Sequence, residues 1–407
     1  MSRIKELDGL RAIAILGVVL MHYTPTYTGA STLVYFGWSG VDLFFAISGF
    51  LITNILIDLR RQETPFRTFY SRRALRIFPN CYLVLVLVVV AAVLHKEQVN
   101  YRTVVRHALF LSSLKPGLLE VIFQRLVFHV HPISTPYHQP TAFYVLEFKD
   151  CLGVYWSLSV EELFYLIWAP IILRGTRRVI VVCSIAPVLV CPMLRALAHT
   201  SPTIDETVGF IFRFDSLAAG GCVAIILWST AKGYLKRHFT DTALILTTGI
   251  SLLGLWLLST YCGVFRGIDV RATLTFSIFG YSLLAVFCAT VVGACARWKG
   301  NLGVFSRILR CRAAVYLGTV SYTMYLTHLP VYVAIQLIML RWFGPRVFEA
   351  NHGLILAWGI AALACTLLLA GLSWRYFESP ILRLKNKRFP VQRALAPPLP
   401  AVQPAAP

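Results

Sequence analysis

The chain has 407 residues, of which 57% are hydrophobic and only 14% are charged, and its mean hydropathy is +0.69. Because about a quarter of the residues of a typical soluble domain are charged, this composition excludes an ordinary soluble protein. The formal net charge is +20. No polar domain carries these basic residues, which argues against nucleic acid as a partner. The charge instead indicates basic loops beside a membrane and a site for an anionic cosubstrate that carries phosphate.

Apolar segments long enough to cross a lipid bilayer as helices follow one another along the whole chain. They lack the short alternating pattern of a membrane barrel, so helices are the expected spanning element. The sequence therefore predicts an all-α protein, a polytopic membrane bundle of about ten transmembrane helices. The predicted spans are residues 9–27, 36–57, 77–95, 156–173, 179–197, 210–228, 241–261, 273–294, 314–338 and 353–373.

The distribution of Lys and Arg predicts the orientation of this bundle. If the N-terminus is cytoplasmic, 26 of the 38 basic residues fall on the cytoplasmic side. Cytoplasmic loops of membrane proteins carry such an excess, so both termini are expected in the cytoplasm. The segments counted are residues 1–11, 58–76, 174–178, 229–240, 295–312 and 374–407.

The first predicted span carries Asp8, Arg11 and His22, and an apolar helix needs none of these ionisable side chains. Arg11 and His22 lie on nearly the same face of a helix, about 16 Å apart along its axis. They cannot touch, but they can hold the two ends of an extended ligand such as a pantetheine arm. A histidine can also take a proton from an attacking hydroxyl and return one to a leaving thiolate. The alternative is a hydrogen-bonded histidine inside the bundle and an arginine that extends to the membrane surface.

The second span contains two glycines and two further candidate site residues. Gly40 and Gly49 would allow another helix to approach closely. Asp42 is costly to bury, so it is expected either to orient His22 or to pair with a cation in a structural role. Ser48 is a weak candidate nucleophile, because no GxSxG motif surrounds it.

A basic cluster precedes the third span on the predicted cytoplasmic side. If this segment is helical, Arg73 and Arg76 are neighbours on one face, and both guanidinium groups can bind phosphate oxygens bidentately. Arg72 can assist them. The alternative is a juxtamembrane cluster that contacts anionic lipid or only fixes the topology.

Two adjacent carboxylates stand near the start of the fourth span. Glu162 is a candidate for positioning an acceptor or His22, whereas Glu161 is expected to be solvated at the helix end. Further along the chain, Asp215 is another intramembrane acid, and His328 is a second candidate base.

We predict no metal site. His129, His131 and His138 lack the spacing of helical metal ligands and have no partner thiol. The ten cysteines include no CxxC motif and lie mostly within apolar segments, so we interpret them as small buried side chains rather than disulfides or ligands.

Taken together and in order, several of these segments resemble the acyltransferase-3 family of membrane-bound O-acyltransferases, across residues 4–380. The similar segments are LDGLRAIAILGVVLMHY (7–23), FFAISGFLI (44–52), RRALRIFP (72–79), YWSLSVEELFY (155–165), RFDSLAAG (213–220), SYTMYLTHLP (321–330) and SWRYFESP (373–380). The resemblance implies a ten-helix core that takes acetyl or another short acyl group from cytoplasmic acyl-CoA. The family's Arg-x10-His element falls on Arg11 and His22, and its Arg-x-x-Arg element falls on Arg73 and Arg76.

The predicted organisation is one transmembrane domain (4–380) followed by a basic, then Pro- and Ala-rich, disordered cytoplasmic tail (381–407). The predicted function is transfer of an acyl group, with acetyl as the first expectation, from acyl-CoA to a hydroxyl of a carbohydrate, a lipid-linked sugar or another small acceptor. The expected location is the plasma membrane, as a multi-pass protein of the bacterial inner membrane. The alternative is a transporter or flippase whose intramembrane charges line a substrate path, although the sequence shows no repeated halves.

Overall fold

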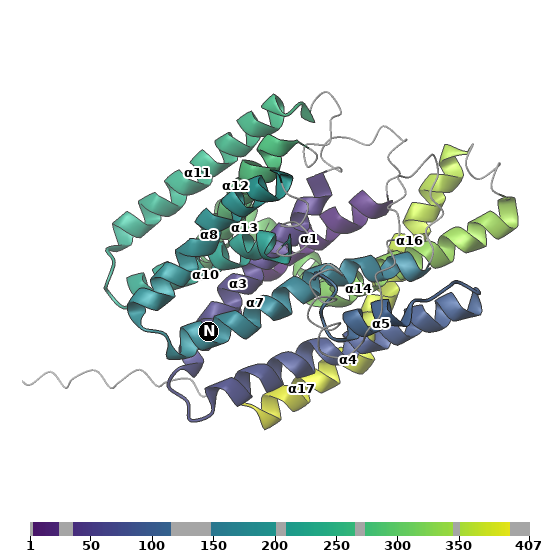
Figure 1. Cartoon of the computed structure of the whole chain (residues 1–407), viewed down its shortest axis with the longest axis horizontal. Helices are drawn as coiled ribbons and strands as arrows, with labels where there is room; N and C mark the ends of the chain where they lie inside the picture. Colours follow the sequence, from purple (N-terminus) through teal and green to yellow (C-terminus); the bar gives the residue numbers. More distant parts are fainter. Residues whose placement is uncertain are drawn as a thin grey trace, which may run out of the picture.

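The computed structural model describes residues 3–23, 36–114, 148–200, 209–264, 273–344 and 351–390. These residues form helices joined by short connections, with no strand among them, which confirms the predicted all-α membrane bundle. The long helices run roughly along one direction (Figure 1). They are α1 (Lys5–Tyr23), α3 (Gly40–Leu59), α4 (Pro65–Leu94), α7 (Tyr155–Arg174), α8 (Arg177–Thr200), α10 (Phe214–Ala231), α11 (Arg237–Tyr261), α12 (Tyr281–Arg297), α14 (Arg312–Phe343) and α16 (His352–Ser373).

Shorter elements complete the described chain. The α-helices among them are α5 (Tyr101–Ala108), α13 (Gly303–Leu309) and α17 (Ser379–Arg388). Short 3-10 helices η2 (Phe36–Ser39), η3 (Phe148–Val154) and η4 (Gly209–Arg213) precede α3, α7 and α10, and π-helical turns η7 (Phe276–Gly280) and η8 (Trp374–Glu378) adjoin α12 and α17.

Nine helical segments in the described ranges are long and apolar enough to cross a membrane. They correspond to nine of the ten predicted spans. The remaining prediction, 9–27, corresponds to α1, whose first two turns carry Lys5, Glu6, Asp8 and Arg11; its last four predicted residues lie outside the described ranges. The chain is thus a multi-pass membrane protein.

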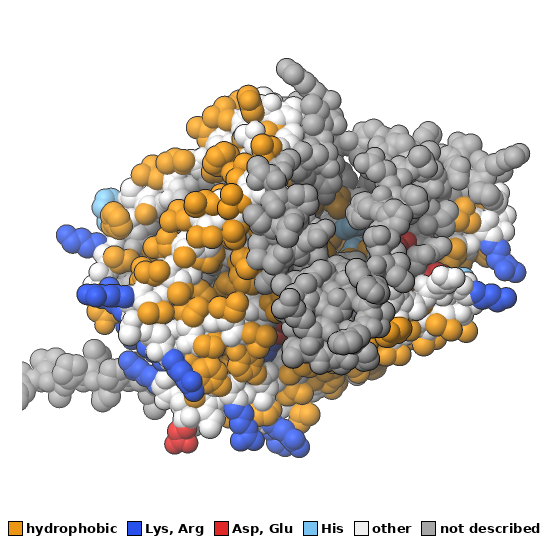
Figure 2. Space-filling view, in the orientation of Figure 1, with side chains coloured by type: hydrophobic (Ala, Val, Ile, Leu, Met, Phe, Trp, Pro, Cys, Tyr) orange, Lys and Arg blue, Asp and Glu red, His pale blue; other side chains and the backbone are white. Residues whose placement is uncertain are grey.

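Helix α1 lies inside the bundle rather than at its edge. It packs along α14 and also contacts η2, α3 and α13. Its residues Ile15, Val18 and Val19 are almost completely buried. By contrast, only 17% of the apolar window of α11 is buried, against 61% for the segment that contains α3. In Figure 2, hydrophobic side chains cover much of the described surface on this face, and Lys and Arg gather toward its ends, as expected for contact with lipid between two aqueous layers.

Glycines allow α3 to approach its neighbours, as the sequence predicted. A Cβ atom at Gly49 would stand 1.9 Å from the carbonyl oxygen of Leu217 on α10, and one at Gly40 would stand 2.4 Å from that of Ala14 on α1. No larger residue fits at these distances, so the two glycines fix how closely the helices pack.

The helix that contains the third predicted span is longer than the span at its N-terminal end. The third span was predicted to begin at residue 77, but α4 begins at Pro65 and continues through Pro79. Proline is well tolerated in the first turn of a helix, where no N–H is needed. Hydropathy detects only the apolar part of such a helix, and the structure shows that the basic turns before it are helical too, which places Arg73 and Arg76 one turn apart on α4.

Candidate active site

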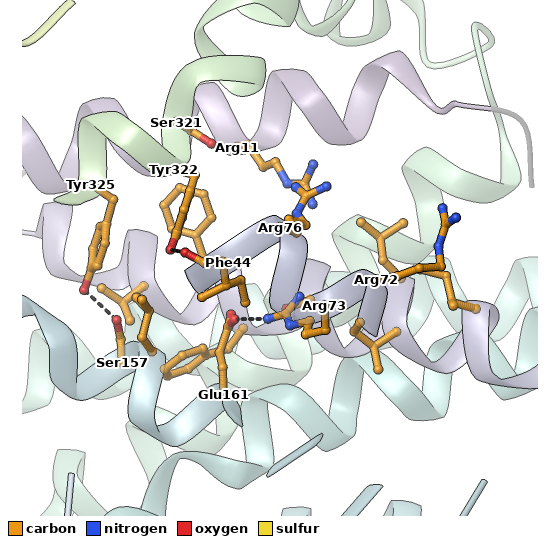
Figure 3. Close-up of a pocket in the computed structure, with 18 of the residues that line it drawn as sticks. Arg11, Phe44, Arg72, Arg73, Arg76, Ser157, Glu161, Ser321, Tyr322 and Tyr325 are labelled. Carbon is orange, nitrogen blue, oxygen red and sulfur yellow. Dashed lines mark hydrogen bonds and ion pairs between the residues drawn. The ribbon is translucent and has the colours of Figure 1, made fainter. Parts of the chain in front are cut away.

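A cavity opens among α1, α3, α4, α7, α14 and α17, with a volume of about 210 Å³. Figure 3 shows side chains from several of these helices converging on it. One part of its wall is apolar, and it is lined by residues that include Val41, Phe44, Phe45, Leu51, Ile52, Phe69 and Ile77. The other part is strongly basic, and it is lined by Arg11, Arg72, Arg73, Arg76 and Lys385. The cavity therefore suits a ligand with an apolar portion and an anionic portion.

Arg73 is neutralised by protein carboxylates. Its Nη2 donates to Oε2 of Glu161 at 2.7 Å, and its Nε donates to Oε1 of Glu162 at 3.2 Å. Its guanidinium also lies 4.0 Å from the centre of the Tyr165 ring. We expected Glu161 to be solvated and Arg73 to face a phosphate, but Glu161 lines the cavity and pairs with Arg73. Arg73 therefore links α4 to α7.

Arg76 is placed differently, although it is only one turn further along α4. It is exposed, lines the cavity, and makes no hydrogen bond or ion pair with any residue that the structure describes. Arg11 lies within electrostatic range of it, and Figure 3 shows the two guanidinium groups pointing into the same space. Arg11 is itself 3.6 Å from Oδ1 of Asp8. Of the predicted Arg-x-x-Arg pair, Arg76 is therefore the one whose charge is available to an anion.

Two further cations lie where α4 and α17 meet, namely Arg72 on α4 and Lys385 on α17. Arg72 donates to the carbonyl oxygen of Phe389 and, at 3.0 Å, to Oδ1 of Asn386. The disordered tail predicted from residue 381 was wrong for residues 381–388, which form most of α17. Polar composition suggested disorder, but these residues gain contacts with α4 that sequence cannot show. Sequence reasoning missed Lys385, because a run of four basic residues does not single out one of them.

His22 does not line the cavity. Its Nδ1 donates to the carbonyl oxygen of Val18 at 2.8 Å, which leaves the lone pair on Nε2. Its ring centre lies 5.0 Å from that of His328, which in turn lies 5.7 Å from the ring of Tyr325. Tyr325 lines the cavity. Arg11 and His22 thus share a helix as predicted, but only Arg11 lines the cavity, and His22 is next to a side chain that contacts the cavity-lining Tyr325.

His328 is completely buried beside His22. Its Nδ1 donates to the carbonyl oxygen of Tyr325 at 2.7 Å, and its Nε2 has no hydrogen-bond partner among the described residues. The hydroxyl of Tyr325 bonds to Oγ of Ser157 at 2.7 Å. A chain of polar side chains therefore leads from the cavity wall to the pair of imidazoles.

The two acids of the second and sixth spans form buried ion pairs. Asp42 accepts from Nη2 of Arg213 at 2.6 Å and from Oγ of Ser216 at 2.8 Å. Asp215 accepts from Nη2 of Arg195 at 2.9 Å. Of the two roles considered for Asp42, the structure favours pairing with a cation over orienting His22. Asp215 likewise joins α10 to α8.

Ser48 lines the cavity, and its hydroxyl bonds to the hydroxyl of Tyr165. No histidine bonds to its oxygen among the described residues, so nothing activates it as a nucleophile. The described ranges also hold no group of three or more His, Cys, Asp or Glu side chains placed to bind a metal. His129, His131 and His138 lie outside them. All ten cysteines are free thiols.

The described helices thus form a membrane bundle that contains a basic, partly apolar cavity and two adjacent histidines, His22 and His328. Residues 4–375 match the model of the acyltransferase-3 family, described as an acyltransferase domain. The chain therefore belongs to this family of membrane-bound acyltransferases.

Particular relatives are known as O-acetyltransferases. The chain is 25% identical over 389 residues to the peptidoglycan O-acetyltransferase OatA of Listeria monocytogenes, covering 93% of this chain and 56% of that protein. It is 24% identical over 392 residues to the O-acetyltransferase OatA of Staphylococcus aureus, covering 94% of this chain and 58% of that protein. The chain thus spans little more than half the length of these relatives. No solved structure matches it.

Proposed function

We propose that this protein transfers an acyl group, with acetyl as the first expectation, from acyl-CoA to a hydroxyl of a carbohydrate, a lipid-linked sugar or another small acceptor. The single observation that carries the donor assignment is the cavity, in which cations and an apolar wall lie side by side. Acyl-CoA has the matching chemistry, since it combines phosphate groups with a long, weakly polar arm. The name of the Listeria monocytogenes relative, a peptidoglycan O-acetyltransferase, supports a carbohydrate as the acceptor.

The donor would bind with its phosphates at the basic end of the cavity. Arg76 and Arg11 provide guanidinium groups that can bind phosphate oxygens bidentately, and Arg72 adds a third beside α17. A cavity of about 210 Å³ is smaller than most sites that enclose a whole ligand. It would therefore hold the thiol and acyl end of the donor, with the nucleotide at the open, basic side.

His22 is the proposed general base. Its Nε2 would take the proton from the acceptor hydroxyl while the oxygen attacks the thioester carbonyl. The carbon–sulfur bond then breaks, and the thiolate leaves and takes a proton from the imidazolium. In the alternative route Nε2 of His22 itself attacks the thioester carbonyl, and the carbon–sulfur bond breaks with release of the thiolate. The acceptor oxygen then takes the acyl group from the imidazole, and the hydroxyl proton passes to the thiolate. His22 is connected to the cavity through neighbouring side chains, since its ring contacts His328, which contacts the cavity-lining Tyr325.

The other predicted residues receive supporting roles in this proposal. Arg11 would hold or polarise the donor side of the reaction. Glu162 would act through Arg73, which it helps to hold in place. The proposed location is the bacterial inner membrane, with acyl-CoA supplied from the cytoplasm and both termini on that side.

The test is an assay of the purified chain in lipid nanodiscs with acetyl-labelled CoA, in which release of free thiol and transfer of label to a peptidoglycan fragment are measured. Replacing His22 with Ala is expected to lower kcat at least a hundredfold. His238→Ala is the matched control, because His238 is exposed at the start of α11. Full activity of His22→Ala would exclude the mechanism. Movement of a sugar substrate across vesicles without acyl-CoA would favour a transporter instead.

A further inference from the structure

Helix α17 is part of the cavity wall, although it follows the last predicted span. It lies along α4, as Figure 1 shows at the lower edge of the bundle. Two anchors hold it there. Near its start, Glu378 accepts a hydrogen bond from Thr323 on α14, and Asn80 on α4 bonds to the same threonine at 2.7 Å. Near its end, Arg72 bonds to Asn386 and to the carbonyl oxygen of Phe389.

Between these anchors, α17 directs one cation into the cavity. Lys385 is half-buried and lines the cavity, whereas Arg383, Lys387 and Arg388 on the same helix are exposed and do not line it. The ammonium group of Lys385 lies within electrostatic range of Arg72, Arg73 and Arg76. It makes no hydrogen bond or ion pair with any residue in the described ranges.

Holding a lysine among arginines in a partly buried place costs free energy, because like charges repel more strongly where water is scarce. Of the carboxylates within electrostatic range of Arg76, Glu161 is bonded to Arg73 together with Glu162, and Glu378 accepts a hydrogen bond from Thr323. Glu378 therefore balances the charge of Arg76 only in part, and no carboxylate among the described residues forms an ion pair with Arg76 or Lys385. An anion with several negative oxygens bound between α4 and α17 would balance the remaining positive charge.

We propose that Lys385, together with Arg76, binds a phosphate group of the donor, and that α17 thereby forms one wall of the donor site. Naming coenzyme A as the carrier of that phosphate rests on the function proposed above. The shared chemistry is a phosphoryl group, which a lipid headgroup could also supply. Arg72 then has a second task, since its bonds to Asn386 and Phe389 hold α17 at the distance from which Lys385 reaches the cavity.

The experiment measures binding of CoA to the full-length chain in nanodiscs of zwitterionic lipid. Lys385→Gln is compared with Arg383→Gln, which removes an exposed charge from the same helix, and Lys385→Arg tests rescue by a retained charge. We expect Lys385→Gln to raise the Kd for CoA about tenfold, the effect of losing one charge-assisted hydrogen bond. Arg383→Gln should leave it unchanged, and Lys385→Arg should restore much of the affinity. Unfolding temperatures should agree among the three variants.

Two further arms separate the possible sources of phosphate. The first arm uses dephospho-CoA, which lacks the 3′-phosphate. If Lys385→Gln does not change the Kd for this ligand, Lys385 contacts the 3′-phosphate, and if it still raises the Kd, Lys385 contacts the diphosphate. Both results support the proposal. Equal CoA affinity of Lys385→Gln and the unchanged chain would overturn it. The second arm repeats the comparison with anionic lipid in the nanodiscs. The proposal is also overturned if Lys385→Gln binds CoA normally and loses affinity only for the anionic lipid.

Transfer activity distinguishes this inference from the proposed function. If the chain binds CoA and Lys385→Gln weakens this binding, but no acyl group is transferred to any hydroxyl, the inferred donor site is supported and the proposed reaction is refuted. If the unchanged chain does not bind CoA at all, both fail. With transfer observed, Lys385→Gln should raise KM for acyl-CoA and leave kcat nearly unchanged, since Lys385 lies away from the reacting atoms.

Discussion

Because Arg73 is paired with two carboxylates and Arg76 is not, we expect substitution of Arg73 to lower stability and substitution of Arg76 to weaken donor binding. Arg73→Ala leaves Glu161 and Glu162 side by side without their cation. The side chains of Arg73, Glu161 and Glu162 are only 12%, 18% and 17% exposed, so water can stabilise the two unpaired carboxylates only in part. Breaking a buried ion pair costs about 3–5 kcal/mol. With this remaining exposure we expect the lower end, about 3 kcal/mol, lost from the free energy of unfolding.

Arg76→Ala is the matched control, since it removes an arginine one turn away that has no ion-pair partner among the described residues. Its stability should stay within about 0.5 kcal/mol of the unchanged chain, while its KM for acyl-CoA rises about tenfold. Thermal unfolding in detergent can be followed with a thiol-reactive dye, because six of the ten free cysteines are buried and become reactive only when the bundle opens. Arg73→Ala should unfold several degrees earlier than Arg76→Ala.

A combined variant tests the reason for the loss. Arg73→Met together with Glu161→Gln and Glu162→Gln removes all three charges at similar volume, and replacing a whole buried ionic group in this way is often close to neutral. It should recover most of the stability that Arg73→Ala loses. If Arg73→Ala unfolds at the same temperature as Arg76→Ala, the ion pairs of Arg73 do not contribute to the free energy of unfolding. The assignment of a structural role to Arg73 and a donor-binding role to Arg76 is then refuted.

Three further predictions follow from the structure. Gly49→Ala should destabilise the bundle by about 1–3 kcal/mol, because the new Cβ would lie 1.9 Å from the carbonyl oxygen of Leu217. Gly249→Ala is the control and should not destabilise the bundle, because a Cβ there meets nothing within 4 Å. Equal unfolding temperatures of the two variants would contradict the close packing of α3 on α10. Asp42→Ala should cost about 3–5 kcal/mol by leaving Arg213 unpaired in the interior, and an unchanged unfolding temperature would show that the pair carries no stability. Affinity for CoA should fall as salt is raised from 50 to 500 mM, because added ions screen the attraction between a phosphate and cations that are at least partly exposed. Equilibrium binding measures this, and a salt-independent Kd would argue against phosphate recognition.

The sequence by itself determined the class of protein and most of its helices. Apolar segments of membrane-spanning length are a local property, and so are the glycines and the intramembrane charges on them. These features were sufficient to predict a helical membrane bundle and to select Asp8, Arg11 and His22 as residues that an apolar helix does not need. They also carried the resemblance to the acyltransferase-3 family, which the match over residues 4–375 confirms.

Only the tertiary structure decided which charges are satisfied and which face the cavity. Arg73 and Arg76 look equivalent along α4, but the carboxylates that neutralise Arg73 lie 88 and 89 residues further along the chain, on α7. Lys385 looked like one basic residue in a tail until the packing of α17 on α4 brought it to the cavity. His22 shares a helix with Arg11, yet it does not line the cavity and instead contacts His328 on α14. The physical reason is that the energy of a buried charge depends on its partner, and here the partners come from helices that are distant in sequence.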